Sequence, residues 1–183
     1  MHASPLARLA STSVAVLALC AGAAHAHGPT PQKVEVSVTI AAPPSAVWAA
    51  VGNFADFAAW NPAVTRSSAD RGNEVGSTRT LTLPAGEVTE QLDDHDAAAM
   101  TMSYRSGRFD AKVLPVSSYS ARLSVKAEGS GSTLRWQARG YRADTGNEPA
   151  PGMDDAAAVA ALKALMTPGL DAVRARLEAA PAN

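Results

Sequence analysis

The clearest pattern in the chain is an alternation of apolar and polar residues that returns in several short segments. In residues 33–40, KVEVSVTI, apolar and polar positions alternate, which is the period of a strand with one buried face. The same period returns in residues 76–83, 87–93, 100–105, 118–125 and 134–138. Turn residues separate these segments, for example Pro84-Ala85-Gly86 and Asp94-His95-Asp96. With a weaker candidate at 64–68, the pattern predicts a meandering antiparallel sheet of about seven strands.

Two other segments carry a helical pattern. From Asp154 to Leu177, apolar residues recur every three or four positions and predict one long amphipathic helix. Residues 41–62, AAPPSAVWAAVGNFADFAAWNP, are rich in aromatics but interrupted by prolines, so they predict two short helices, the first capped by Ser45. A sheet with one apolar face must be covered. We therefore expect an α+β fold in which a curved antiparallel sheet wraps round the long C-terminal helix.

The first 26 residues differ in composition from the rest. Arg8 precedes an apolar run from Leu9 to Ala24, and Ala24-His25-Ala26 follows it, as in a secretory signal peptide. A lipoprotein interpretation of Cys20 is disfavoured, because Leu19 before it is not a small residue. We expect cleavage after Ala26, export to the periplasm, and a mature chain that contains no cysteine and depends on its core alone.

The remaining chain is simple in organisation. After the signal peptide (1–26) we predict an extended leader over 27–32, a single domain over 33–180 and a tail over 181–183. The whole chain has 16 Lys and Arg against 17 Asp and Glu, without a block of basic residues. This composition disfavours nucleic acid and anionic membranes as partners. We expect no membrane insertion once the signal is removed.

Four stretches carry a resemblance to a known superfamily: residues 34–62, residues 76–96 with MTMSYR, STLRWQARGY, and LMTPGLDAVRARLE. In their order they resemble the START-like helix-grip superfamily, which includes the polyketide cyclase/dehydrase and lipid-transport group. The resemblance spans roughly Val34 to Leu177. It implies a helix-grip fold with an internal cavity for a small apolar or amphipathic molecule. The mature opening HGPTPQKV is similar to that of small periplasmic accessory proteins of bacterial methanol-oxidation systems, which implies a periplasmic dehydrogenase or cytochrome as partner.

Arg79 and Glu90 are the most informative charged residues, because each shares a strand face with apolar neighbours. If the turn at 84–86 pairs Leu81 with Val88, then Arg79 lies opposite Glu90. An inward pair could anchor a ligand in an apolar cavity. It could equally be a structural ion pair, and both interpretations stay open.

Five further residues complete the predicted ligand-binding set. They are Asn61, Trp60, Met102, Tyr104 and Tyr119. The first two end the second short helix, where the family's short helices close one end of the cavity. The methionine and the tyrosines are candidates for the cavity wall. Methionine adapts to varied apolar shapes, and tyrosine brings a hydroxyl to the end of an apolar body. All of them are also consistent with an ordinary core, which is the expectation for Trp48 and Trp136.

The sequence gives little support to catalysis. It shows no nucleophile–base arrangement, phosphate loop or metal-spaced cluster, so we expect no catalytic residue, no cofactor and no metal ligand. His95 is expected in a solvated turn. His27, as the mature N-terminus, could chelate copper through its imidazole and the new α-amine. A stable redox site would need a further histidine, and only His95 is available.

Three functions stay open. The first is a periplasmic, non-enzymatic binding or accessory protein with an internal cavity. The second is a cyclase or dehydratase that uses Glu90 or Asp94 as base and Arg79 or Tyr104 as electrophile. A Glu90 that faces an open pocket would favour this enzyme, and a Glu90 paired with Arg79 would favour a structural role.

The third function is a protein-interaction module with a filled core. In it, Trp60, Met100, Met102 and Tyr119 would close the cavity, and the outer surface would carry the function. A pocket far smaller than the several hundred Å³ of a ligand site would favour it. The identity of the ligand, the partner and the oligomeric state are beyond what the sequence predicts.

Overall fold

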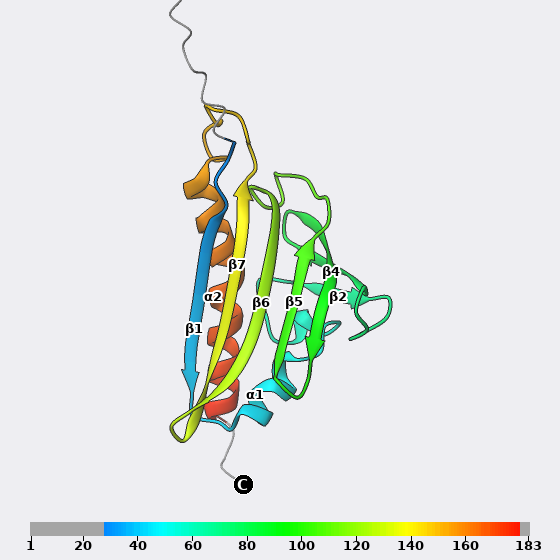
Figure 1. Cartoon of the computed structure of the whole chain (residues 1–183), viewed down its shortest axis with the longest axis vertical. Coiled ribbons are helices and arrows are strands. Elements are labelled where there is room, and N and C mark those ends of the chain that lie inside the picture. The colour runs from blue at the N-terminus through cyan, green and yellow to red at the C-terminus, as the bar shows by residue number, and fades with distance from the viewer. Residues whose placement is uncertain (1–27, 180–183) are drawn as a thin grey trace, which may run out of the picture.

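The computed structural model describes residues 28–179. The predicted signal peptide (1–26) and tail (181–183) lie outside the described residues. Within 28–179 the chain forms a seven-stranded antiparallel sheet in the order β1-β7-β6-β5-β4-β3-β2 (Figure 1). The elements are β1 (Gln32–Ile40), α1 (Pro44–Val51), the 3-10 turn η1 (Phe57–Ala59), β2 (Arg66–Ala69), β3 (Thr78–Leu83), β4 (Gly86–Asp96), β5 (Thr101–Ser106), β6 (Val116–Glu128), β7 (Gly131–Arg142) and α2 (Asp155–Ala179).

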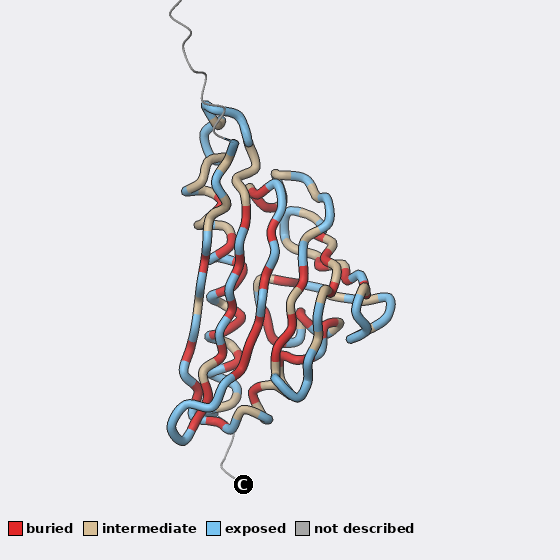
Figure 2. Tube along the Cα trace, viewed as in Figure 1, coloured by how far each residue is buried: buried red, intermediate tan, exposed pale blue. Residues whose placement is uncertain are grey.

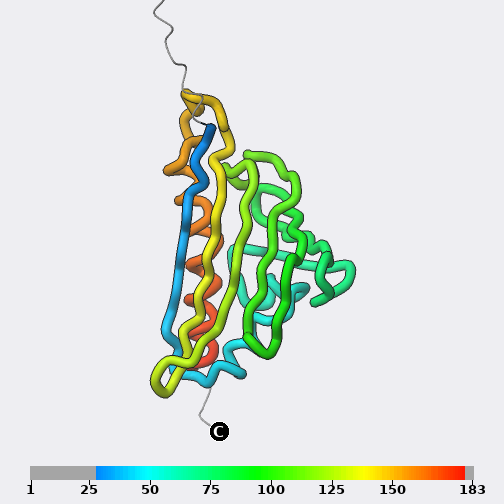
Figure 3. The backbone as a smooth tube through the Cα atoms, viewed as in Figure 1, coloured from blue at the N-terminus to red at the C-terminus, as the bar shows by residue number. Residues whose placement is uncertain are grey.

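The long helix α2 lies along one side of the sheet. It packs on β1 and β7, and Figure 3 shows it behind these two strands, while β4 and β5 extend away to one side. Length and composition alone would let α2 cross a membrane, but here its apolar side faces the core. The buried positions of α2 are Ala158, Leu162, Leu165, Met166, Gly169, Leu170 and Val173. The predicted helix-grip architecture, with two short helices after the first strand, is confirmed.

One hydrophobic core fills the space between the sheet and α2 (Figure 2). The strands alternate as the sequence predicts, because successive side chains of a strand point to opposite faces. On β6, for example, Tyr119, Ala121 and Leu123 are buried, whereas Ser120 and Arg122 are exposed. The sheet thus has an inner face of apolar side chains and an outer face of polar ones.

The hairpin of β3 and β4 has the predicted register. Pro84-Ala85 connects the strands, and Leu83 pairs with Gly86. Gly86 has a φ of 145°, in the region that favours glycine. A two-residue connection fixes the register of both strands, so Leu81 pairs with Val88 and the pair Arg79–Glu90 follows.

The predicted turn at 94–96 is wrong. Strand β4 continues to Asp96, with a bulge between Leu92 and Asp94, and the turn follows at 97–100. Met100, predicted as the first residue of the next strand, lies in that turn with a φ of 53°. A bulge of this kind keeps a strand going while re-aiming its side chains.

His95 is therefore not in a solvated turn. It is half-buried on β4 with Nε2 2.8 Å from the carbonyl oxygen of Gly52, and its ring centroid lies 5.5 Å from that of Trp48. The bulge and the extended strand bring it against the end of α1. The other histidine of the copper hypothesis, His27, lies outside the described residues.

The start of α1 also differs from the expectation. Pro43 precedes the helix and Pro44 is its first residue, without a side-chain cap. Ser45, the predicted cap, is therefore inside the first turn. Proline suits this position because it lacks the amide hydrogen that a first turn leaves unbonded.

Candidate functional site

Arg79 and Glu90 form an ion pair inside the core. Arg79 Nε lies 2.5 Å from Glu90 Oε2, and each side chain is 1% exposed. Adjacent strands β3 and β4 bring the two side chains together from directly opposite positions on the inner face. Two charges at this depth are tolerated only when they neutralise one another and their hydrogen-bonding capacity is used.

Tyr119, which reaches the pair from β6, completes the coordination of Glu90. Its hydroxyl donates to Glu90 Oε1 over 2.5 Å. Both carboxylate oxygens of Glu90 therefore accept hydrogen bonds, one from a guanidinium and one from a phenol. Burial raises the pKa of Tyr119 well above its ordinary value, and the charge of Glu90 raises it further. The neutral phenol is thereby maintained as a donor.

Aromatic rings surround the guanidinium of Arg79. Its Cζ lies 4.2 Å from the ring centroid of Phe54, 4.3 Å from that of Phe57 and 4.5 Å from that of Tyr104. These distances allow cation–π attraction, which is strongest in a desolvated setting. Burial also raises the pKa of Tyr104, with a further contribution from the charge of Glu90.

The guanidinium of Arg79 is not fully satisfied. Nε bonds Glu90, and Nη1 donates to the carbonyl oxygen of Phe54 over 3.1 Å. Nη2 is buried and has no hydrogen-bond acceptor among residues 28–179. A buried donor without a partner is costly, so this nitrogen marks where an oxygen atom of a ligand would be stabilised.

Asn61 and Trp60 lie at a different place, against α2. Asn61 is 0% exposed; its Nδ2 donates to the carbonyl oxygen of Leu165 over 2.9 Å, and its Oδ1 accepts from the backbone of Ala63 over 3.0 Å. Trp60 packs on Phe57 at 4.6 Å between ring centroids. The amide of Asn61 is thus used to dock the turn η1 on the long helix.

A glycine on α2 permits this docking. A Cβ atom at Gly169 would lie 2.8 Å from Trp60 Cζ3 and 2.9 Å from Asn61 Cγ. Such contacts are too short for any side chain at that position. The small residue after Pro168 therefore explains how the aromatic segment 41–62 packs so closely on α2.

The structure brings together four of the seven residues predicted for the ligand site. Arg79, Glu90, Tyr104 and Tyr119 form one buried cluster. Met102 is buried on the same inner face, one inward position along β5 from Tyr104. Asn61 and Trp60 belong to the α2 contact instead. None of the seven is more than 5% exposed.

Phe54 and Phe57 belong to the cluster, although they were not among the ligand-binding residues predicted from the sequence. Their rings cover Arg79, and the carbonyl group of Phe54 accepts a hydrogen bond from it. Their spacing of three residues was a signal that they share a face. A backbone carbonyl leaves no trace in a sequence, so that bond was not predictable.

Of the two tryptophans expected in the core, one is buried and the other is only partly buried. Trp136 is buried and packs edge-on against Phe57 and Trp60. Trp48 is only partly buried, where α1 meets His95.

Within the described part of the chain, no group of three or more His, Cys, Asp or Glu side chains lies close enough together to hold a metal ion.

The fold and this cluster define a helix-grip protein with a polar centre inside its sheet. Residues 31–178 match the family described as polyketide cyclase/dehydrase and lipid transport, and the chain belongs to that family. No curated protein is significantly similar to the chain.

Solved structures share this fold. XoxI from Bacillus cereus is 21% identical with a TM-score of 0.66, over 79% of this chain and 94% of XoxI. A protein from Bacillus thuringiensis is 21% identical with a TM-score of 0.65, over 80% of this chain and 98% of its own. Ara h 8.0201 is 18% identical with a TM-score of 0.62, over 80% of this chain and 97% of its own. At these identities the likeness concerns the fold.

Proposed function

We propose that this chain is a periplasmic, non-enzymatic protein that binds a small amphipathic molecule inside the helix-grip domain. The observation that carries the proposal is the buried Nη2 of Arg79, which has no acceptor among residues 28–179. An oxygen of the ligand would accept from it, and the surrounding rings of Phe54, Phe57 and Tyr104 would contact the apolar part. The family description, which includes lipid transport, supports this class of ligand.

Entry of a ligand requires side chains to move, because the cluster is buried. The segment 107–115 connects β5 and β6, and its Phe109 lies over Tyr119 with ring centroids 6.1 Å apart. Phe109 is only partly buried. Displacement of Phe109 would uncover the ring of Tyr119, so we place the entrance beneath this segment.

The engagement of Glu90 supports a binding role over catalysis. A general base must come within hydrogen-bond reach of the substrate, and the side chain of Glu90 is only 1% exposed. Both oxygens of Glu90 already accept hydrogen bonds, from Arg79 and Tyr119. Asp94, the alternative base, lies exposed on β4.

A second candidate function is a protein-interaction module with a filled interior. Two observations favour it. The inner side chains pack against one another, and a hollow of about 500 Å³ lies on the outer face of the sheet. An accessory role beside a periplasmic dehydrogenase or cytochrome of methanol oxidation rests on the predicted signal peptide and on the resemblance of the mature N-terminus.

Native mass spectrometry of the protein purified from the periplasm tests these functions together. The intact mass gives the cleavage site, expected after Ala26. A bound small molecule in the wild type that is lost in Arg79→Met but retained in Arg122→Met supports the internal ligand site. Arg122 is the matched control because it is an exposed arginine on the outer face.

The other outcomes separate the candidates. A co-purifying dehydrogenase or cytochrome without a small molecule supports the accessory role. A small molecule that both variants retain contradicts the assignment to Arg79. If Arg79→Met does not fold, the double variant Arg79→Met/Glu90→Gln removes the uncompensated charge and serves in its place.

A further inference from the structure

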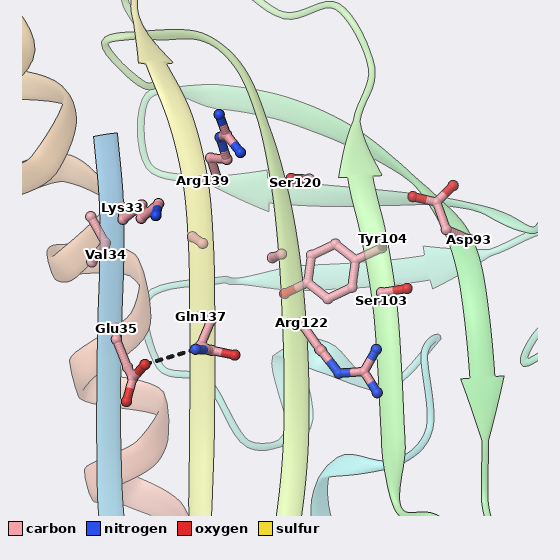
Figure 4. A pocket seen from close by; sticks show the side chains of 12 residues that line it. Lys33, Val34, Glu35, Asp93, Ser103, Tyr104, Ser120, Arg122, Gln137 and Arg139 are labelled. Atoms are coloured by element: carbon pink, nitrogen blue, oxygen red, sulfur yellow. Dashed lines mark hydrogen bonds between the residues drawn. The ribbon is translucent and has the colours of Figure 1, made fainter. Parts of the chain in front are cut away.

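The outer face of the sheet carries a continuous groove along β6. Three adjoining hollows lie there, and neighbouring hollows share residues of their linings: Ser120 and Arg139 in one case, Arg122 and Gln137 in the other. The largest has a volume of about 500 Å³. Figure 4 shows it across β1, β7, β6 and β5, with Glu35 bonded to Gln137.

The outward face of β6 carries small side chains as well as the long side chains of Arg122 and Lys126. The outward positions of β6 include Ser118, Ser120 and Ser124. The outward positions of β7 carry Arg135 and Arg139. The short serines therefore form low points of the groove between the longer side chains of β6 and those of β7.

The side chains that line the groove are mainly cationic. Six cations line it, against the three carboxylates of Glu35, Asp93 and Glu128. The cations are Lys33, Arg105, Arg122, Lys126, Arg135 and Arg139. The whole chain has a formal net charge of −1, so the positive charge is a local property of this face.

Most of these cations have no carboxylate partner. Arg105 pairs with Asp93, and Arg135 pairs with Glu35 at 3.3 Å. The other four form no ion pair with any residue in the range 28–179. Pairing across the sheet also places Lys33, Arg139, Ser120 and Arg105 in one row without a carboxylate.

We propose that this groove binds an extended acidic segment of a partner protein. Between Ser118 and Lys126 the groove runs for about 27 Å, the length of about eight residues of extended chain. Carboxylates on alternate residues of such a segment would face the cations of β6 and β7. The serine hydroxyl groups at these low points can bond its backbone.

The positive charge of the groove also disfavours a second copy of this chain as its occupant. In a two-fold dimer the groove would meet itself, and like charges in contact cost free energy. An acidic partner gains from the same cations, and its association would be accelerated by the field of the groove. The inference uses only the outer face, so it holds whether or not the interior takes a ligand.

The test is fluorescence anisotropy with the exported protein and a rhodamine-labelled peptide of about eight residues that alternates Glu and Ser. A peptide with Gln in place of Glu is the uncharged control. We expect binding of the Glu peptide only, with affinity falling at least about tenfold between about 20 and 200 mM salt. We expect Arg122→Glu/Arg139→Glu to weaken binding by at least about tenfold.

A matched variant distinguishes the effect of the groove's own cations from the effect of the protein's net charge. Arg66→Glu/Lys163→Glu makes the same change of charge at exposed positions on β2 and α2, and should alter the affinity by less than about twofold. Equal losses in both double variants, or equal binding of the Gln peptide, would overturn the proposal. Self-association in sedimentation that Arg122→Glu/Arg139→Glu abolishes would overturn it too, because the groove would then be an interface between copies.

Discussion

Arg79 and Glu90 lie opposite one another on β3 and β4, with Nε and Oε2 2.5 Å apart and both side chains 1% exposed. The pair is the charged centre of an otherwise apolar interior. Both carboxylate oxygens of Glu90 and two of the three guanidinium nitrogens of Arg79 have hydrogen-bond partners. The buried pair is consistent with a structural role and, through the third nitrogen, with a ligand contact.

Removal of Arg79 alone should destabilise the fold strongly. Arg79→Met leaves the carboxylate of Glu90 buried without its counter-charge, which costs about 3–5 kcal/mol of unfolding free energy. Chemical denaturation measures the loss. Adding Glu90→Gln should restore most of it, because the second substitution removes the isolated charge.

An exposed ion pair provides the control for this experiment. Glu35 pairs with Arg135 on the outer face, where both side chains are about half exposed. Glu35→Gln should cost less than about 1 kcal/mol. A similar cost for both substitutions would mean that Arg79 and Glu90 are hydrated in solution.

Tyr119→Phe should also destabilise the protein, by about 1.5–3 kcal/mol, because it removes a hydrogen bond to a buried charge. Thermal and chemical unfolding provide the measurement. Tyr141→Phe, at a half-buried position on β7, should change stability by less than about 0.5 kcal/mol. An unchanged stability of Tyr119→Phe would show that water replaces the phenol beside Glu90.

The two raised tyrosine pKa values predict a loss of stability at high pH. In the folded chain burial raises the pKa of Tyr104 and Tyr119 above the ordinary value of 10.0, so the folded state favours the neutral phenols. Below about pH 10 both states are neutral and stability is unaffected. Above it only the unfolded state ionises readily, and each tyrosine lowers stability by about 1.4 kcal/mol per pH unit.

Ultraviolet absorbance of tyrosinate tests this prediction. Between about pH 9 and pH 11.5, Tyr104→Phe and Tyr119→Phe should leave the titration of the native protein unchanged. In denaturant each substitution should remove one tyrosine from the titration. A smaller native amplitude in either variant would show that its phenol is reached by hydroxide in the folded state.

Gly169→Ala tests the contact between α2 and the aromatic segment. The new Cβ would overlap Trp60 and Asn61, at a cost of about 1–3 kcal/mol for overpacking. Alanine's better helix propensity returns about 1 kcal/mol, so we expect a small net loss in chemical denaturation. Gly28→Ala, where a Cβ meets no atom within 4 Å, should be neutral. A Gly169→Ala variant more stable than the wild type would contradict the close packing.

Much of the fold was predictable because its signals are local. Alternation of apolar and polar residues predicts which strand positions face inward, and β6 follows that pattern over most of its length. The two-residue turn at Pro84-Ala85 fixes one register, so the pairing of Arg79 with Glu90 followed from counting residues. The prediction of a turn at 94–96 was wrong, because a bulge lets β4 continue through residues that commonly form turns.

By itself, then, the sequence determined the elements, their order, the inner face of each strand and one cross-strand ion pair. Only the tertiary structure decided what surrounds that pair: the phenol of Tyr119, the ring of Phe57 and the carbonyl group of Phe54 come from distant parts of the chain. It also decided that Asn61 bonds α2 and that the outer hollows join into one groove. Contacts between residues far apart in the chain depend on packing in three dimensions, for which local periodicity carries no signal.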